Sequence, residues 1–125
     1  MIRIAVVEDN KRVRTALWNQ LKRLPDVIVV TFTCGEDLLA LKADVQTHYR
    51  VVITDGYLGW TRMDGPTLTQ KIKSGSPKTK FIGYTNDDSL RVAFRKSGIH
   101  NFIERGDNLE PFVEAVVKAV KGFLT

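Results

Sequence analysis

Five side chains that could bind a cation or a phosphate group stand directly after apolar runs of the sequence. They are Glu8, Asp9, Asp55, Thr85 and Arg105. Three of them are acids, which repel one another at close range unless they are separated, protonated or bound to a cation. A cluster of few oxygen ligands suits a hydrated Mg²⁺ ion, and a hydroxyl with a cation opposite suits a transferred phosphoryl group. These residue types indicate a carboxylate nucleophile, a divalent metal and phosphate-binding donors.

The hydropathy pattern predicts how these residues are brought together. Apolar runs alternate with segments of helical period, which is typical of an α/β fold with a parallel sheet and helices on both faces. We expect strands at 2–7, 27–32, 51–54, 81–84 and 102–104 and helices at about 10–24, 36–42, 64–73, 88–97 and from 109 onwards. Because ligands bind outside the carboxyl ends of the strands in such sheets, the five side chains are candidates to converge.

The composition is that of one globular domain. The 125 residues are 43% hydrophobic and 26% charged, which excludes a disordered or fibrous chain. This length allows one core and not two, so we expect a single domain over residues 1–125. No zinc-ligand spacing is present, and Cys34, the one cysteine, cannot form an internal disulfide. The net charge of +5 permits an anionic partner but identifies none.

The sequence also favours a cytoplasmic location. No apolar run approaches the roughly 20 residues that span a bilayer, so we expect no membrane contact. The first apolar run is followed at once by two acids, unlike the apolar region and cleavage site of a signal peptide.

In their order and spacing, the motifs resemble the receiver domain of two-component response regulators. The matching pieces are Glu8-Asp9 after Ile-Ala-Val-Val, Val-Val-Ile-Thr before Asp55, Met63-Asp64-Gly65, Tyr84-Thr85, and Gly98 followed by Phe102-Ile-Glu-Arg105. Each piece is short, but together they cover essentially the whole chain. The resemblance implies a flavodoxin-like (βα)5 fold, a doubly wound parallel sheet with strand order 2-1-3-4-5.

The resemblance also implies roles for the acids. Asp55 would be the phosphoacceptor, which takes a phosphoryl group from the phosphohistidine of a histidine kinase or phosphotransfer protein. Asp9 and Asp55 would bind Mg²⁺ directly, with the backbone carbonyl of Tyr57 as a further ligand. Glu8 would act mainly through water. Asp64 is expected to cap a helix and not to bind metal.

A conformational output is implied as well. Thr85 would donate its hydroxyl to the phosphoryl oxygens, and its inward movement would let Phe102, at the family's switch position, turn inward. The new charge would thereby alter the face of helix 88–97, strand 102–104 and the last helix, which faces an output protein or domain, or a second copy in a homodimer. The domain would not be an enzyme for other substrates, because it catalyses only its own phosphorylation and dephosphorylation.

Several positions depart from the family. Arg105 replaces the phosphate-binding lysine, and since a planar guanidinium is bulkier than an ammonium, it either contacts the phosphoryl group or sits outside the site. Gly106 replaces the proline that usually follows. The segment between Asp55 and Asp64 is two residues longer than usual, with Tyr57 and Trp60 expected to be exposed. This loop could gate access or shape partner choice, and loops also accept insertions without consequence.

The segment between Thr85 and Gly98 is two residues shorter than usual, and Asn86 stands where a small residue is expected. These departures leave one alternative open, a degenerate receiver that acts as a phosphorylation-independent interaction module. The chain could also be the regulatory segment of a larger DNA-binding regulator or hybrid kinase. It has no room for an added helix-turn-helix, so we expect no direct nucleic-acid contact by this domain.

Other function classes are disfavoured. No G-x-x-x-x-G-K-[ST] loop follows a strand, and the first strand ends in Glu-Asp-Asn and not in a glycine-rich turn, which argues against ATPases, GTPases and Rossmann dinucleotide enzymes. We assign no role to His48 and His100. The basic residues near the first and fourth helices are expected on solvated faces; they are Lys11, Arg12, Arg14, Arg91, Arg95 and Lys96.

Overall fold

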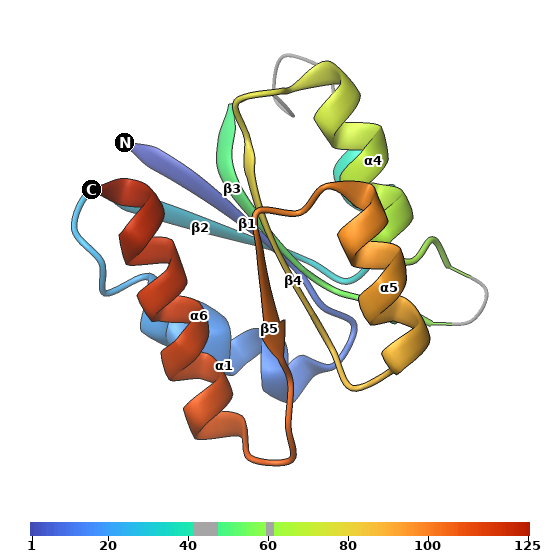
Figure 1. The fold of residues 1–125 in the computed structure, drawn as a ribbon. Coiled ribbons are helices and arrows are strands. Elements are labelled where there is room, and N and C mark those ends of the chain that lie inside the picture. The colour runs from blue at the N-terminus through green and yellow to red at the C-terminus, as the bar shows by residue number, and fades with distance from the viewer. Residues whose placement is uncertain (42–47, 60–61) are drawn as a thin grey trace.

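The computed structural model describes residues 1–41, 48–59 and 62–125. Its centre is a sheet of five parallel strands in the order β2-β1-β3-β4-β5, which confirms the fold class and the strand order (Figure 1). The strands are β1 (Ile2–Val7), β2 (Val27–Phe32), β3 (Tyr49–Asp55), β4 (Lys80–Thr85) and β5 (Asn101–Glu104). The helices are α1 (Lys11–Leu21), α2 (Gly35–Leu39), α4 (Gly65–Gly75), α5 (Asp88–Ser97) and α6 (Leu109–Leu124).

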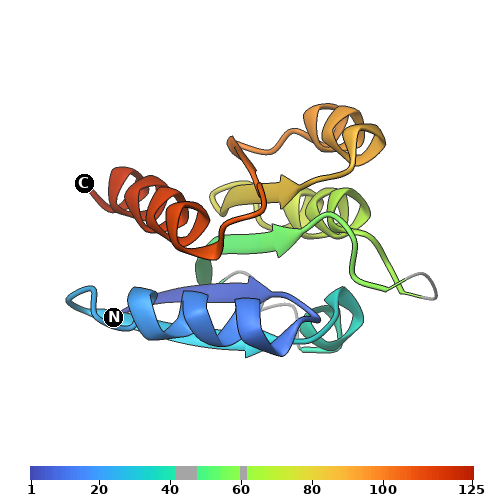
Figure 2. The ribbon, with the colours of Figure 1, turned by 90° about the horizontal axis from the view of Figure 1, so that it is seen from below.

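The helices cover both faces of the sheet and make two cores. On one face, α1 and α6 pack their apolar stripes against β1, β3 and β4, with Leu17 and Val116 fully buried. On the other face, α2 and α4 pack against the same strands, with Leu38 and Leu68 buried. Figure 2 shows the strands following one another from β2 to β5, with α4 and α5 side by side. Alternate strand residues serve alternate cores, as the pleat requires.

Most helix ends match their sequence signals. The side chains of Asn10 and Asp64 accept hydrogen bonds from the backbone N–H groups of Val13 and Thr67, so both are the expected N-caps. Helix α5 ends at Ser97, and Gly98 follows in the left-handed conformation.

Several boundaries differ from the prediction, many of them by one residue, and α4 extends further, to Gly75. Helix α1 ends at Leu21 and not near residue 24. The next residues form a tighter turn, in which the N–H groups of Arg23 and Leu24 donate to the carbonyls of Gln20 and Leu21. Helix α2 ends at Leu39; the predicted end at Lys42 lies outside the described residues. Strand β3 begins two residues early, at Tyr49, because a register shift opposite Arg3 and Ile4 lets the strand include Arg50.

Helix α5 lies very close to the sheet at one point. A Cβ added at Gly83 of β4 would lie 2.6 Å from the ring of Phe94, and the same ring lies against Gly56 and Gly65. Glycine is thus required at Gly83 because the ring occupies the place of its side chain. Phe94 and Ser97 are the buried residues of α5, and the helix also packs against α4. No helix in the described part of the chain is both long and apolar enough to cross a membrane.

Candidate functional site

The structure brings three acids together at the carboxyl ends of β1 and β3. Glu8, Asp9 and Asp55 each offer one carboxylate oxygen, and these oxygens lie within 4.8 Å of one another. Strands β1 and β3 are neighbours in register, so the residues that follow their last buried positions must meet at one edge of the sheet. The three acids differ in depth: Glu8 is buried, Asp55 is half-buried and Asp9 is exposed.

Glu8 is held on both of its carboxylate oxygens. Its Oε1 accepts a hydrogen bond from the hydroxyl of Tyr84 at 2.7 Å, and its Oε2 accepts one from the backbone N–H of Asn10 at 3.0 Å. Burial, and then the charge of Asp55, raise the pKa of Glu8 to about 8. Both oxygens thus have one protein partner each, and an indirect, water-mediated contact of Glu8 with an ion stays a prediction.

Asp55 is the last residue of β3, and a nearby backbone N–H group orients its side chain. Its Oδ1 accepts a hydrogen bond from the N–H of Tyr57 at 3.2 Å, and its carbonyl oxygen accepts one from the hydroxyl of Thr54 at 2.9 Å. Burial, with a further contribution from the charge of Asp9, raises the pKa of Asp55 to about 6. The backbone of the acidic pair is fixed by Arg14, whose guanidinium donates to the carbonyls of Glu8 and Asp9.

These electrostatics fit a divalent cation. Oxygens of the three carboxylates lie within 4.8 Å of one another, and two of the acids have a raised pKa. Negative charge at this site is therefore crowded and only partly compensated. A hard cation would reverse that situation by favouring the ionised form of each acid. Asp9 and Asp55, the more accessible acids, suit direct ligation of Mg²⁺, which binds few protein carboxylates and retains several waters.

Thr85 lies at the end of β4, next to β3. A Cβ added at Gly56, the residue that follows Asp55, would lie 3.1 Å from the Cβ of Thr85. Its hydroxyl oxygen accepts a hydrogen bond from the N–H of Asp87 at 3.0 Å, which leaves the hydroxyl proton for another acceptor. The side chain is buried, with 4% of its surface exposed.

Arg105 points towards α6. Its guanidinium lies 4.9 Å from the ring centroid of Phe112, and its Nη1 donates to the carbonyl of Gly106 at 3.1 Å. The neighbouring loops are tied by Asn86, whose side chain bonds both to the N–H and to the carbonyl of Gly106. These contacts are with Phe112 and Gly106; a role of Arg105 in binding a phosphoryl group stays a prediction.

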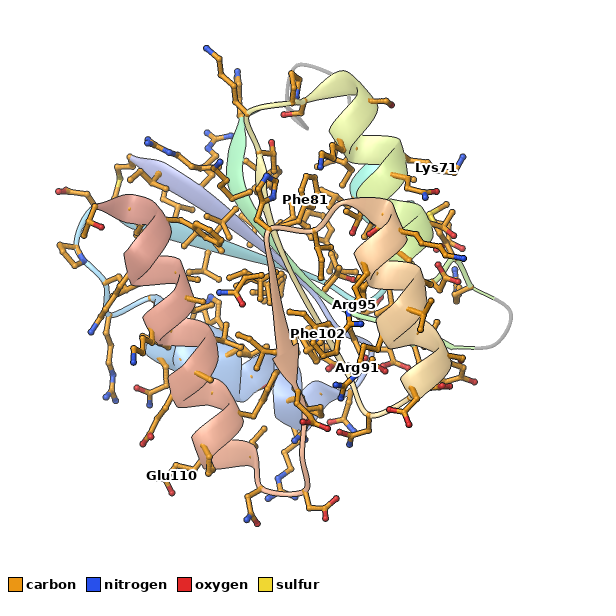
Figure 3. All side chains as sticks on the ribbon, in the orientation of Figure 1. Lys71, Phe81, Arg91, Arg95, Phe102 and Glu110 are labelled. Carbon is orange, nitrogen blue, oxygen red and sulfur yellow. The ribbon has the colours of Figure 1, made fainter. Side chains whose placement is uncertain are left out.

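Phe102 is a residue of β5, and its ring lies beside α5 (Figure 3). Its half-buried ring contacts the ring of Phe94, with centroids 6.0 Å apart, and the guanidinium of Arg91 lies 5.1 Å from its centroid. Arg91 also pairs with Glu104 at 2.9 Å. The switch position implied by the resemblance is therefore covered by a cation that bridges α5 and β5.

The long loop after Asp55 borders this cluster. Tyr57 is 51% exposed, as expected, and its N–H faces Asp55; its carbonyl as a metal ligand stays a prediction. Trp60 lies outside the described residues.

Sequence reasoning missed Tyr84. An aromatic residue inside a strand usually signals core packing, and Tyr84 is indeed fully buried. Its hydroxyl, however, contributes to the site by donating to Glu8, 76 residues away along the chain. A buried tyrosine needs a hydrogen-bond partner, and that requirement was the one available signal.

Comparisons with known proteins agree with the fold and with the geometry of the site. Residues 4–117 match the family model described as the response regulator receiver domain. The chain is 31% identical over 130 residues to a probable transcriptional regulatory protein, SgaR, of Hyphomicrobium methylovorum, covering 99% of the chain and 58% of that protein. It is 27% identical over 125 residues to response regulator GacA of Pseudomonas aeruginosa, covering 98% of the chain and 56% of that protein.

The chain thus spans just over half the length of these two relatives. Among solved structures it is similar to the BeF3-activated receiver domain of DrrB, a protein of Thermotoga maritima, with a TM-score of 0.80 and 28% identity over 99% of this chain and 97% of that one. The family model, the relatives and the fold agree, and the chain belongs to the family of response regulator receiver domains.

Proposed function

We propose that this domain is the phosphoacceptor of a two-component phosphorelay in the cytoplasm, with Asp55 as the acceptor. The observation that carries the proposal is the placement of Asp55. One carboxylate oxygen accepts a hydrogen bond from the N–H of Tyr57, and a carboxylate oxygen lies within 4.8 Å of one from Glu8 and one from Asp9. A carboxylate oriented in this way, beside a cation site, is a nucleophile suited to phosphoryl transfer.

In this reaction a carboxylate oxygen of Asp55 attacks the phosphorus of a phosphohistidine on a histidine kinase or phosphotransfer protein. The P–N bond breaks, and the imidazole leaves with the bonding electron pair. Bound Mg²⁺ supplies charge neutralisation for the transferred group, and Asp9 and Asp55 would hold it, with Glu8 reached through water. The hydroxyl of Thr85, at the end of the neighbouring strand β4, would bind a phosphoryl oxygen.

Water then attacks the acyl phosphate and restores Asp55 with release of inorganic phosphate. The domain therefore catalyses only its own phosphorylation and dephosphorylation. The charge on Asp55 would act on Thr85 and Phe102 and alter the face of α5, β5 and α6, to which an output protein, an output domain or a second copy would bind. Arg91, which covers Phe102 and bonds Glu104, is the contact that this change must rearrange.

Intact-mass analysis tests this proposal. Wild type and Asp55→Asn are incubated with Mg²⁺ and acetyl phosphate, with and without a chelator. One phosphoryl group on wild type, absent from the variant and abolished by the chelator, is expected. An adduct of equal size on Asp55→Asn would contradict the assignment of Asp55.

A second candidate function is a degenerate receiver that binds a protein partner without phosphorylation. The position of Arg105 favours it, because the guanidinium lies against Phe112 and the Asn86–Gly106 bonds hold the adjacent loops. In this state the cation of Arg105 is not directed at the acceptor carboxylate.

Arg105→Lys and Arg105→Gln separate the two candidates. If the arginine acts as a phosphate ligand, Arg105→Lys is labelled at about the wild-type rate and Arg105→Gln more slowly. If wild type is unlabelled and Arg105→Lys gains the adduct, the native chain is the degenerate form. Equal labelling of all three proteins would remove Arg105 from the chemistry altogether.

A further inference from the structure

A continuous line of contacts leads from the acidic cluster to α6. Glu8 accepts the hydroxyl of Tyr84 at 2.7 Å, and the Tyr84 ring lies against the ring of Phe112 of α6, with centroids 4.6 Å apart and planes tilted by 57°. The guanidinium of Arg105 also lies against Phe112, 4.9 Å from the centroid of its ring.

This line is distinct from the implied switch of Thr85 and Phe102. Tyr84 belongs to the core under α1 and α6, whereas Phe102 contacts Phe94 of α5. Figure 3 shows the separation: Phe102 lies beside α5, and Glu110 marks the first turn of α6 on the other side of β5. Adjacent residues of β4, Tyr84 and Thr85, thus serve different sides of the molecule.

We propose that Tyr84 is a positioning residue that holds Glu8 in the cation site and couples that site to helix α6 through Phe112. This inference rests on the cation site of the proposed function.

The coupling follows from the packing. Tyr84 and Glu8 are both at most 1% exposed, and Phe112 is 3% exposed. A change of charge at the cluster changes how strongly Glu8 accepts the Tyr84 hydroxyl. Because a close-packed interior leaves the Tyr84 ring no room to move alone, Phe112 must move with it.

Nuclear magnetic resonance of the backbone amides tests the proposal during titration with Mg²⁺. The N–H of Tyr57, bonded to Asp55, reports on the site, and the amides of Val113 and Val116 report on α6. In wild type, all three are expected to shift with one midpoint.

Tyr84→Phe removes only the hydroxyl. The Mg²⁺ midpoint is expected to rise at least threefold, and the shifts of Val113 and Val116 are expected to fall to less than half. Phe112→Leu keeps the Tyr84–Glu8 hydrogen bond and loses the ring contact, so the midpoint stays at the wild-type value while the α6 shifts fall. Positioning and coupling are thereby measured separately.

Tyr49→Phe is the matched control, because Tyr49 is also a buried sheet tyrosine but belongs to the core on the opposite face. It is expected to behave as wild type. Wild-type shifts in α6 and a wild-type midpoint in folded Tyr84→Phe would overturn the proposal.

A failure of the cation site is distinguishable from a failure of the coupling. If the Tyr57 amide of wild type does not respond to Mg²⁺, the cofactor of the proposed function is wrong. The coupling is then decided by Glu8→Gln, which replaces the carboxyl group that accepts the Tyr84 hydroxyl by an amide at the same position. Its effect on Val113 and Val116 must appear in the wild-type background and be lost in the Tyr84→Phe background; equal effects in both would overturn the coupling.

Discussion

Asn86 and Gly106 form a reciprocal pair of hydrogen bonds across the carboxyl end of the sheet. The side-chain oxygen of Asn86 accepts from the N–H of Gly106 at 2.8 Å, and its side-chain nitrogen donates to the Gly106 carbonyl at 3.3 Å. The pair joins the loop after β4 to the loop after β5. It fixes the backbone next to Arg105 at the place where the family usually has a lysine followed by proline.

Gly106→Ala tests the backbone geometry of this pair. The φ angle of Gly106 is +63°, and an added Cβ would meet no atom within 4 Å, so the cost is conformational. We expect a loss of about 1 kcal/mol in the free energy of unfolding, measured by urea denaturation. Gly122→Ala is the control: its Cβ also meets nothing, but Gly122 lies inside α6, and alanine there should stabilise by about 0.5 to 1 kcal/mol. Equal effects at the two sites would contradict the assigned geometry.

Asp55→Asn should stabilise the folded domain at neutral pH without Mg²⁺. The pKa of Asp55 is raised to about 6 in the fold, so the folded state holds its proton more tightly than the unfolded state does. The stabilisation that proton binding at Asp55 gives to the fold is complete below pH 4 and is lost as the pH rises through 6. We expect the variant to gain about 1 to 3 kcal/mol at pH 7.5 and nothing at pH 4. Thermal unfolding at the two pH values measures this, and a destabilised variant at pH 7.5 would contradict it.

Mg²⁺ should stabilise wild type in proportion to its occupancy of the site. A ligand at 100 times its Kd adds about 2.7 kcal/mol to the free energy of unfolding when it binds only the folded state. Because the raised pKa values of Glu8 and Asp55 mean that protons compete for these oxygens, the affinity should increase from pH 6 to pH 8. Denaturation at several Mg²⁺ concentrations gives both quantities. Asp55→Asn should lose most of the effect, and an unchanged effect would place the ion elsewhere.

His100 should titrate below its ordinary range and weaken the fold in acid. Its Nδ1 accepts a hydrogen bond from the N–H of Phe81 at 3.1 Å, and burial, with the charges of Lys80 and Lys73, lowers its pKa. As the pH falls through 6.5 the unfolded chain takes up the proton first, so stability decreases. The His100 ring and the Phe81 amide should show one shared midpoint below 6.5 by nuclear magnetic resonance. Separate midpoints would contradict the hydrogen bond, and exposed His48 provides a comparison.

The acidic cluster was predictable because its members directly follow apolar runs, and parallel strands place those positions at one edge. Strand order was not available from the pattern alone and came from the family resemblance. The predicted end of α1, near residue 24, was too late. Pro25 sets the last position that the helix could reach, and the helix ends before that limit. The early start of β3 depends on a bulge at Arg50, which no periodicity shows.

The contacts of Tyr84 and Arg105 were beyond sequence reasoning for different reasons. The hydroxyl of Tyr84 meets Glu8 only through the register of β1, β3 and β4. Arg105 has a long side chain whose direction is decided by competition between Phe112 and the acids, and residue type does not settle that competition.

Phe94 gives helix α5 a contact with the sheet that involves little interlocking of side chains. The ring rests on backbone at Gly83, Gly56 and Gly65, and it also meets the ring of Phe102. Further ties of α5 are polar and run to its neighbours: Lys73 of α4 donates to the carbonyl of Gly98, and Arg91 pairs with Glu104 of β5. The orientation of α5 therefore depends on its contacts with α4 and β5 as well as on the sheet beneath it.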